Sequence, residues 1–105
     1  MANLEHAINN YKPQSELYVQ YFLNQYSDRV QLQFVSALYH GRTHLGQTSF
    51  CIEGEHPAQV GTLNADHISK NEYARLISEK GNNVVTYLNT FRECAYNSDF
   101  DINNL

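Results

Sequence analysis

The strongest constraint on the fold is a helical spacing of apolar residues that returns along most of the chain. Pro13, Gly41 and Gly81 stand where such segments end, and proline and glycine commonly interrupt helices. The sequence therefore predicts a mainly α fold, with four or five amphipathic helices packed as a small bundle in a single domain. The expected helices are a short one within 1–12, followed by 16–26, 27–41, 69–81 and 82–96.

The composition is that of a folded protein that binds neither nucleic acid nor membranes. Its 105 residues suit one domain, and 42% hydrophobic against 17% charged residues is too apolar for disorder. The net charge of -4 offers no basic surface for phosphate backbones. No apolar stretch approaches the roughly 20 residues of a membrane span, and the first residues lack a signal-peptide pattern. We therefore expect a cytoplasmic location.

The segment 16–26 is apolar around most of its helical circumference. Ser15 is a suitable N-cap, and the polar residues of the segment form one narrow stripe. A small bundle has few places to bury so much of one helix, so we expect this segment to contact a partner. Tyrosine suits such interfaces because one end of its side chain is apolar and the other polar. The predicted interface consists of Leu17, Tyr18, Tyr21, Phe22 and Tyr26.

The segment 27–41 fits two interpretations. Between positions 30 and 34, apolar residues alternate with glutamines, as they would in a half-buried strand. A helix accounts for more of the segment, because most of its polar residues then share one face. In the helical interpretation, Ser27 or Asp28 supplies the N-cap and Gly41 ends the helix.

Residues 42–66 hold three of the five glycines and one of the two prolines. A loop of this length is unusual in a compact domain. The segment is expected to be an irregular insert, to contain a short helix, or to form a small β-hairpin that pairs "TSFCIE" with "AQVGTL". With the hairpin, the fold class would be α+β.

The last third of the chain is expected to hold two antiparallel helices. Ser69 and Glu72 fit a capping box, and Gly81 fits the cap that ends the first helix. The short Gly-Asn-Asn connection favours a second helix folded back along the first. The polar segment 97–105 is predicted to be a loose tail, with apolar residues that could dock at 100, 102 and 105.

A polar cluster that follows residue 39 is the candidate ligand-binding or metal-binding site. His40, Arg42 and His44 are candidate ligand-binding residues, since arginine can clamp an anion while histidine moves a proton. His40 and His44 could also bind a metal together with Cys51 and His56. The competing explanation is that the histidines lie at the surface or cap a helix C-terminus, and that the cysteine packs in the core. Since no catalytic motif completes the cluster, we predict no catalytic residue and no cofactor.

The segments "ALYHGR" and "YLNTF" together resemble the pattern of a family of small, all-helical bacterial proteins of unknown function. The resemblance implies an all-helical fold and a bacterial source, and it implies no activity. The matching residues are Ala37, Leu38, Gly41, Arg42, Tyr87 and Leu88.

These features predict a small protein-interaction module that self-associates as a homodimer through residues 16–26. The alternative is a small-molecule or metal-dependent enzyme that uses the polar cluster after residue 39. A third hypothesis is an inhibitor of a host protein, which the size and acidity of the chain permit.

Overall fold

The computed structural model describes residues 2–50, 62, 65 and 67–105, which are mostly helical. The prediction of a mainly α fold of bundled helices is confirmed, and the described residues contain no strand. Most of the predicted hairpin lies outside them. The elements are α1 (Leu4–Asn10), α2 (Glu16–Leu23), α3 (Asp28–Thr43), α4 (Tyr73–Lys80) and α5 (Asn83–Asn97), with the 3-10 turns η2 (Lys70–Glu72) and η3 (Ile102–Asn104).

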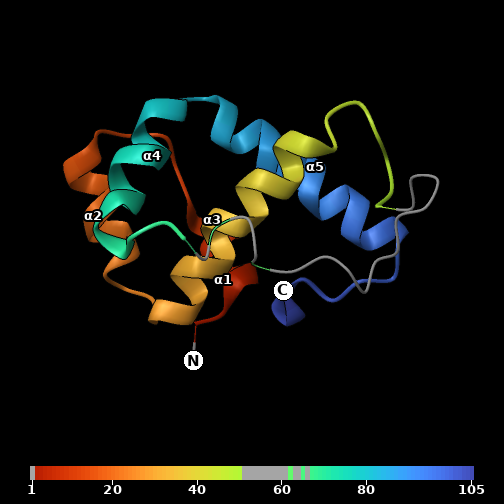
Figure 1. Cartoon of the computed structure of the whole chain (residues 1–105), viewed down its shortest axis with the longest axis horizontal. Helices are drawn as coiled ribbons and strands as arrows, with labels where there is room; N and C mark the ends of the chain where they lie inside the picture. Colours follow the sequence, from red (N-terminus) through yellow and green to blue (C-terminus); the bar gives the residue numbers. More distant parts are fainter. Residues whose placement is uncertain (1, 51–61, 63–64, 66) are drawn as a thin grey trace.

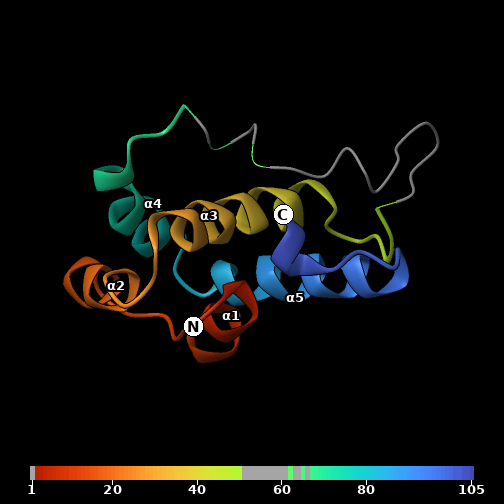
Figure 2. The same ribbon diagram turned by 90° about the horizontal axis from the view of Figure 1, so that it is seen from below.

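Helix α3 is the centre of the bundle (Figures 1 and 2). α5 packs along the C-terminal half of α3, whereas α2 and α4 form a pair near its N-terminal end (Figure 1). α1 packs on α3 beside the turn η3. Side chains from all five helices contribute to a single hydrophobic core, so the chain folds as one unit in the part that is described.

Gly41 lies inside α3 and allows α3 and α5 to approach closely. A Cβ atom added to Gly41 would lie 1.8 Å from the carbonyl oxygen of Tyr87 on α5, so only glycine permits two backbones this close. The prediction that Gly41 ends the helix is wrong, because α3 continues to Thr43 and His44 forms its C-cap. The packing of α3 on α5 outweighs the roughly 1 kcal/mol that glycine costs in a helix interior.

Replacement of Gly41 by alanine should lower the free energy of unfolding by roughly 3 kcal/mol, because one backbone must move to admit the methyl group. Alanine's better helix propensity offsets only about 1 kcal/mol of the gross cost. Thr43→Ala, at the exposed end of α3, is the control and should change stability by less than about 0.5 kcal/mol. Urea unfolding measures both variants. Equal stability of Gly41→Ala and the wild type would contradict the close approach.

Gln31 is buried in the bundle, where the nitrogen of its side-chain amide binds backbone carbonyl groups. Its Nε2 atom donates to the carbonyl oxygens of Leu23 and Tyr26, at 2.8 and 3.1 Å. These bonds satisfy carbonyl groups at the end of α2 and tie that end to α3. The strand-like alternation of glutamine with apolar residues therefore belongs to a helix, in which the glutamine points inward.

The segment that follows α5 packs on the bundle through Phe100, Ile102 and Leu105, so the structure shows the docking that the sequence allowed and not a loose tail. Gln33 Nε2 donates to the backbone oxygens of Asn103 and Leu105, at 3.1 and 3.2 Å. Arg29 donates to the same oxygen of Leu105 at 3.1 Å, and Leu105 itself is buried. A polar composition favours a loose segment, but here side chains of α3 bind the backbone oxygens of the segment and hold it on the bundle.

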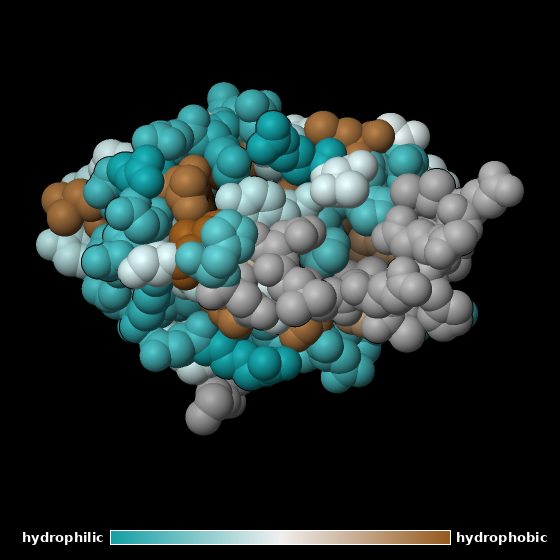
Figure 3. Space-filling model, viewed as in Figure 1, coloured by the Kyte–Doolittle hydropathy of each residue, from teal (hydrophilic) through white to brown (hydrophobic). Residues whose placement is uncertain are grey.

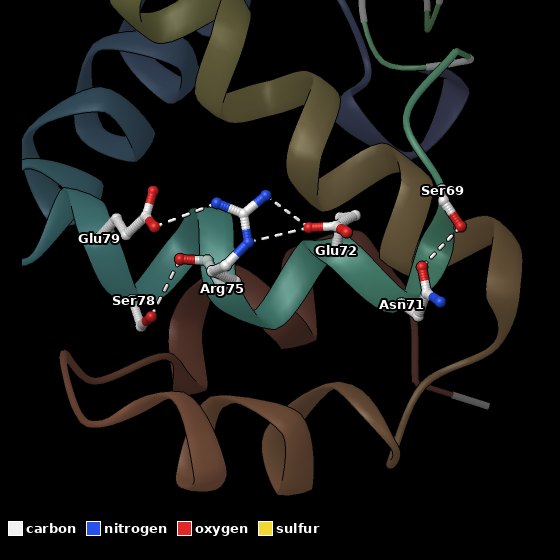
Figure 4. A network of polar contacts seen from close by, with 6 residues as sticks. All are labelled: Ser69, Asn71, Glu72, Arg75, Ser78 and Glu79. Carbon is white, nitrogen blue, oxygen red and sulfur yellow. Dashed lines mark hydrogen bonds and ion pairs between the residues drawn. The ribbon is translucent and has the colours of Figure 1, made fainter.

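The start of α4 lacks the predicted capping box. Ser69 Oγ donates to Asn71 Oδ1 at 2.6 Å, while Glu72 forms an ion pair with Arg75 (Figure 4). Gly81 does cap the end of α4, with a φ of 54°, as predicted. Beyond Gly81, α5 turns toward α3 and away from α4, so the prediction of an antiparallel pair is wrong (Figure 1).

Tyr11 carries a buried hydroxyl group that has no hydrogen-bond partner among the described residues. Its ring packs against Phe22 and Phe34, with centroids 5.4 and 5.5 Å apart. Burial disfavours the phenolate and raises the pKa of Tyr11 from 10.0 to about 12. Because the pKa is higher in the folded state, ionisation of Tyr11 does not change the free energy of unfolding below about pH 10, and it lowers that free energy as the pH rises toward about 12.

We expect Tyr11→Phe to raise the free energy of unfolding at neutral pH by about 1 kcal/mol, because it removes an unpaired buried hydroxyl group. It should also reduce the loss of stability above about pH 10. Tyr96→Phe, at a side chain that is 84% exposed, should change neither property. Urea unfolding at neutral pH and at about pH 11 tests both expectations. If Tyr11→Phe loses as much stability as the wild type between these conditions, another group governs the alkaline effect.

Candidate binding surface on α2

The inward face of α2 is held by an aromatic cluster. Phe22 contacts the rings of Tyr11, Tyr26 and Phe34, with centroid distances of 5.4, 5.1 and 5.5 Å. Tyr26 is fixed in turn, because its hydroxyl group lies 2.9 Å from Nδ1 of His6 on α1. Contacts from α1 and α3 therefore determine which side of α2 faces outward.

The outward face of α2 presents three large side chains that the chain itself does not cover. Leu17 is 60% exposed, and Tyr18 and Tyr21 are each 58% exposed. The two tyrosine rings lie edge to face, with centroids 6.2 Å apart. We call these three residues the α2 surface. In Figure 3, hydrophobic side chains are visible over α2 at the left edge of the molecule.

The predicted interface is divided between the surface and the core. Leu17, Tyr18 and Tyr21 are exposed, whereas Phe22 and Tyr26 are buried in the aromatic cluster. Helical geometry explains the burial of Phe22, which shares a face of α2 with the buried Val19 and Leu23, whereas Tyr26 lies beyond the end of the helix and packs on Phe22. The sequence shows that α2 has too many apolar positions for one core face. It does not show which of them the other helices cover.

A groove of about 400 Å³ lies beside the α2 surface and shares both of its tyrosines. Lys12 is the one charged residue among its described lining residues, and the other polar groups there are side-chain amides and hydroxyls. The sequence does not predict this groove, because its polar residues fit no motif. Besides Lys12, the lining consists of Asn10, Gln14, Tyr18, Tyr21, Phe22 and Gln25.

Other exposed hydrophobic residues are more widely spaced along the chain. Leu45 follows α3, while Val85 and Tyr96 are near opposite ends of α5. Single exposed apolar residues are normal on protein surfaces, whereas a group suggests a contact. Among the described residues, α2 carries the group of three.

The two candidate histidines pack in a second aromatic cluster at the end of α3. His44 is 2% exposed, and its Nδ1 atom donates to the carbonyl oxygen of His40 at 2.7 Å. Its ring lies edge-on to Phe50 with a centroid distance of 5.0 Å, and the ring of His40 stacks on Phe91 at 6.2 Å. His44 is the C-cap of α3, as the competing explanation allows, but its burial contradicts a surface position for this histidine.

The other members of the polar cluster are not placed beside these two histidines in the described part of the chain. Arg42 is exposed, and its place two positions after His40 sets it toward the other side of α3. Cys51 and His56 lie outside the described residues. Within the described part of the chain, no group of three histidine, cysteine or carboxylate side chains is placed to hold a metal ion.

Comparison with known proteins yields no match, either to a family model or to a curated protein or solved structure. The resemblance to small helical bacterial proteins therefore stays a prediction. Two of the residues behind it, Gly41 and Tyr87, meet where α3 crosses α5. No described helix is both long enough and apolar enough to cross a lipid bilayer.

Proposed function

We propose that this chain is a protein-binding module and that its simplest partner is a second copy of itself. The observation that carries the proposal is the α2 surface, where Leu17, Tyr18 and Tyr21 are each more than half exposed. Tyrosine loses little conformational freedom on binding and offers both apolar area and a hydroxyl group, which makes it common in interfaces.

A homodimer is the simplest assembly because a twofold contact needs only one self-complementary surface. The α2 surface is suited to such a contact because its three side chains carry no charge. Two copies can therefore meet face to face without like charges at the centre of the interface.

The size of the α2 surface implies modest affinity. Three half-exposed side chains of this size present roughly 300 Å² per copy, against about 800 Å² for a standard interface. The polar residues of the adjacent groove must supply part of the remaining contact. We therefore expect a dimer that dissociates in the micromolar range.

Glutamate in place of Tyr18 or Tyr21 should abolish dimerisation, because each change buries a carboxylate in the centre of the contact on both copies. Tyr96→Glu is the matched control, since Tyr96 is an even more exposed tyrosine on α5. Sedimentation velocity over a concentration series up to about 1 mM measures the dissociation constant of each protein. A wild-type chain that stays monomeric throughout, or a Tyr96→Glu variant as defective as Tyr18→Glu, would refute the proposal.

The other hypotheses have no geometric support of this kind. An enzyme built on the polar cluster needs His40, Arg42 and His44 to converge on a substrate, and the described contacts hold both histidine rings against phenylalanines. No specific feature favours an inhibitor of a host protein. These two hypotheses and the cytoplasmic location stay predictions from the sequence.

A further inference from the structure

The groove and Leu17 lie on opposite sides of the two exposed tyrosines of α2. Tyr18 and Tyr21 line the groove, which extends past them to the buried Phe22, whereas Leu17 lies outside its described lining. At 3.6 residues per turn, Leu17 and Phe22 point about 140° apart on α2, with both tyrosines between them. The α2 surface therefore has a projecting leucine along one edge and a hollow along the other.

The helix becomes polar on the far side of Leu17. Gln20 Nε2 donates to Asn24 Oδ1 at 2.8 Å, and helical spacing places both side chains on the side of Leu17 that faces away from the groove. The apolar area therefore ends at Leu17. With 60% of its surface exposed, Leu17 is available to enter a hollow on another molecule.

A stable contact through α2 has to fill the groove. The three exposed side chains present roughly 300 Å² per copy, against about 800 Å² for a standard interface, so the walls of the groove must contribute. Well-packed interfaces also leave few voids. Tyr18 and Tyr21 already form the wall of the groove, which leaves Leu17 as the member of the α2 surface that can occupy the groove of a second copy.

We propose that, in the homodimer, Leu17 of each copy occupies the groove of the other. This inference rests on the proposed function, because it specifies how the two α2 surfaces fit together. A twofold axis that runs along α2 sets each edge of one surface against the opposite edge of the second copy, so both grooves are filled. An axis across the helix would set groove against groove, and would place Leu17 near Asn24 of the second copy.

Cross-linking between single cysteines tests which residues meet. Leu17→Cys in one copy should cross-link to Gln14→Cys in the other, because Gln14 lines the groove at the same end of α2 as Leu17. The matched control is Leu17→Cys with Asn24→Cys, the pair that an axis across the helix would bring together.

Each pair of variants is mixed in equal amounts, above the dissociation constant of the wild type, and treated with a short bismaleimide. Mass spectrometry identifies the cross-linked heterodimer. All variants carry Cys51→Ser, and the parent with this change alone reports any reaction of the buried Cys94.

Truncation of Leu17 measures what its contact contributes. Leu17→Ala should weaken dimerisation roughly tenfold, because each dimer loses two buried leucine side chains. Leu45→Ala is the matched control, since Leu45 is an exposed leucine that follows α3, and it should dimerise like the wild type. Sedimentation velocity measures both variants, and circular dichroism establishes that their helices are intact.

The outcomes separate this inference from the proposed function. Preferential cross-linking of Leu17→Cys to Gln14→Cys, together with weaker dimerisation of Leu17→Ala, supports the placement of Leu17 in the groove. Suppose instead that the wild type forms a dimer that Tyr18→Glu disrupts. Cross-linking of Leu17→Cys to Asn24→Cys at least as well as to Gln14→Cys, or full association of Leu17→Ala, then overturns the placement of Leu17 and leaves the proposed function intact. A monomeric wild type overturns both.

Discussion

The close crossing of α3 and α5 at Gly41 is the contact on which the rest of the bundle depends. Because no side chain separates the two backbones there, α3 continues beyond the glycine and reaches His44. The end of α3 then carries His44 into contact with Phe50, while Phe91 of α5 covers His40. A larger residue at position 41 would push α3 and α5 apart and weaken both of these histidine–phenylalanine contacts, since protein cores are too densely packed to absorb the displacement.

The other end of α3 determines how α2 is displayed. Gln31 binds the carbonyl oxygens of Leu23, at the end of α2, and of Tyr26 just beyond it. Phe22 packs against Tyr11, which follows α1, and against Phe34 of α3. α4 packs against α2 as well, yet Tyr18 and Tyr21 stay uncovered. The candidate binding surface is therefore a fixed face of the fold, held by buried contacts on the opposite side of the same short helix.

Local pattern was enough to predict the helices, and it failed where a distant residue decides the outcome. Helical spacing and the caps at Ser27 and Gly81 depend on neighbours in sequence, and the structure bears them out. Gly41 satisfies a local rule for helix termination, but its role depends on Tyr87, 46 positions away (87 minus 41). The docking of the C-terminal segment also depends on distant residues, because Arg29 and Gln33 of α3 donate hydrogen bonds to its backbone oxygens.

The candidate site was also predictable only as far as local pattern allows. The apolar excess of residues 16–26 follows from composition and spacing, so the sequence identified the correct helix. Which side chains stay exposed depends on where α1, α3 and α4 contact that helix, and this moved Phe22 and Tyr26 into the core. The groove with Lys12 was missed because it is formed by side chains that share no motif.

The exposed residues of α2 contribute little to the stability of the single chain. Leu17, Tyr18 and Tyr21 keep more than half of their surface in contact with water, so burial within one copy accounts for only part of their hydrophobic potential. Polar side chains at these positions would leave the Phe22 cluster and the Gln31 hydrogen bonds in place. The folding of one chain therefore explains the inward face of α2 and leaves the aromatic character of its outward face unexplained. The proposed binding to a second protein surface would supply that physical reason, since it would remove from water the area that the bundle leaves exposed.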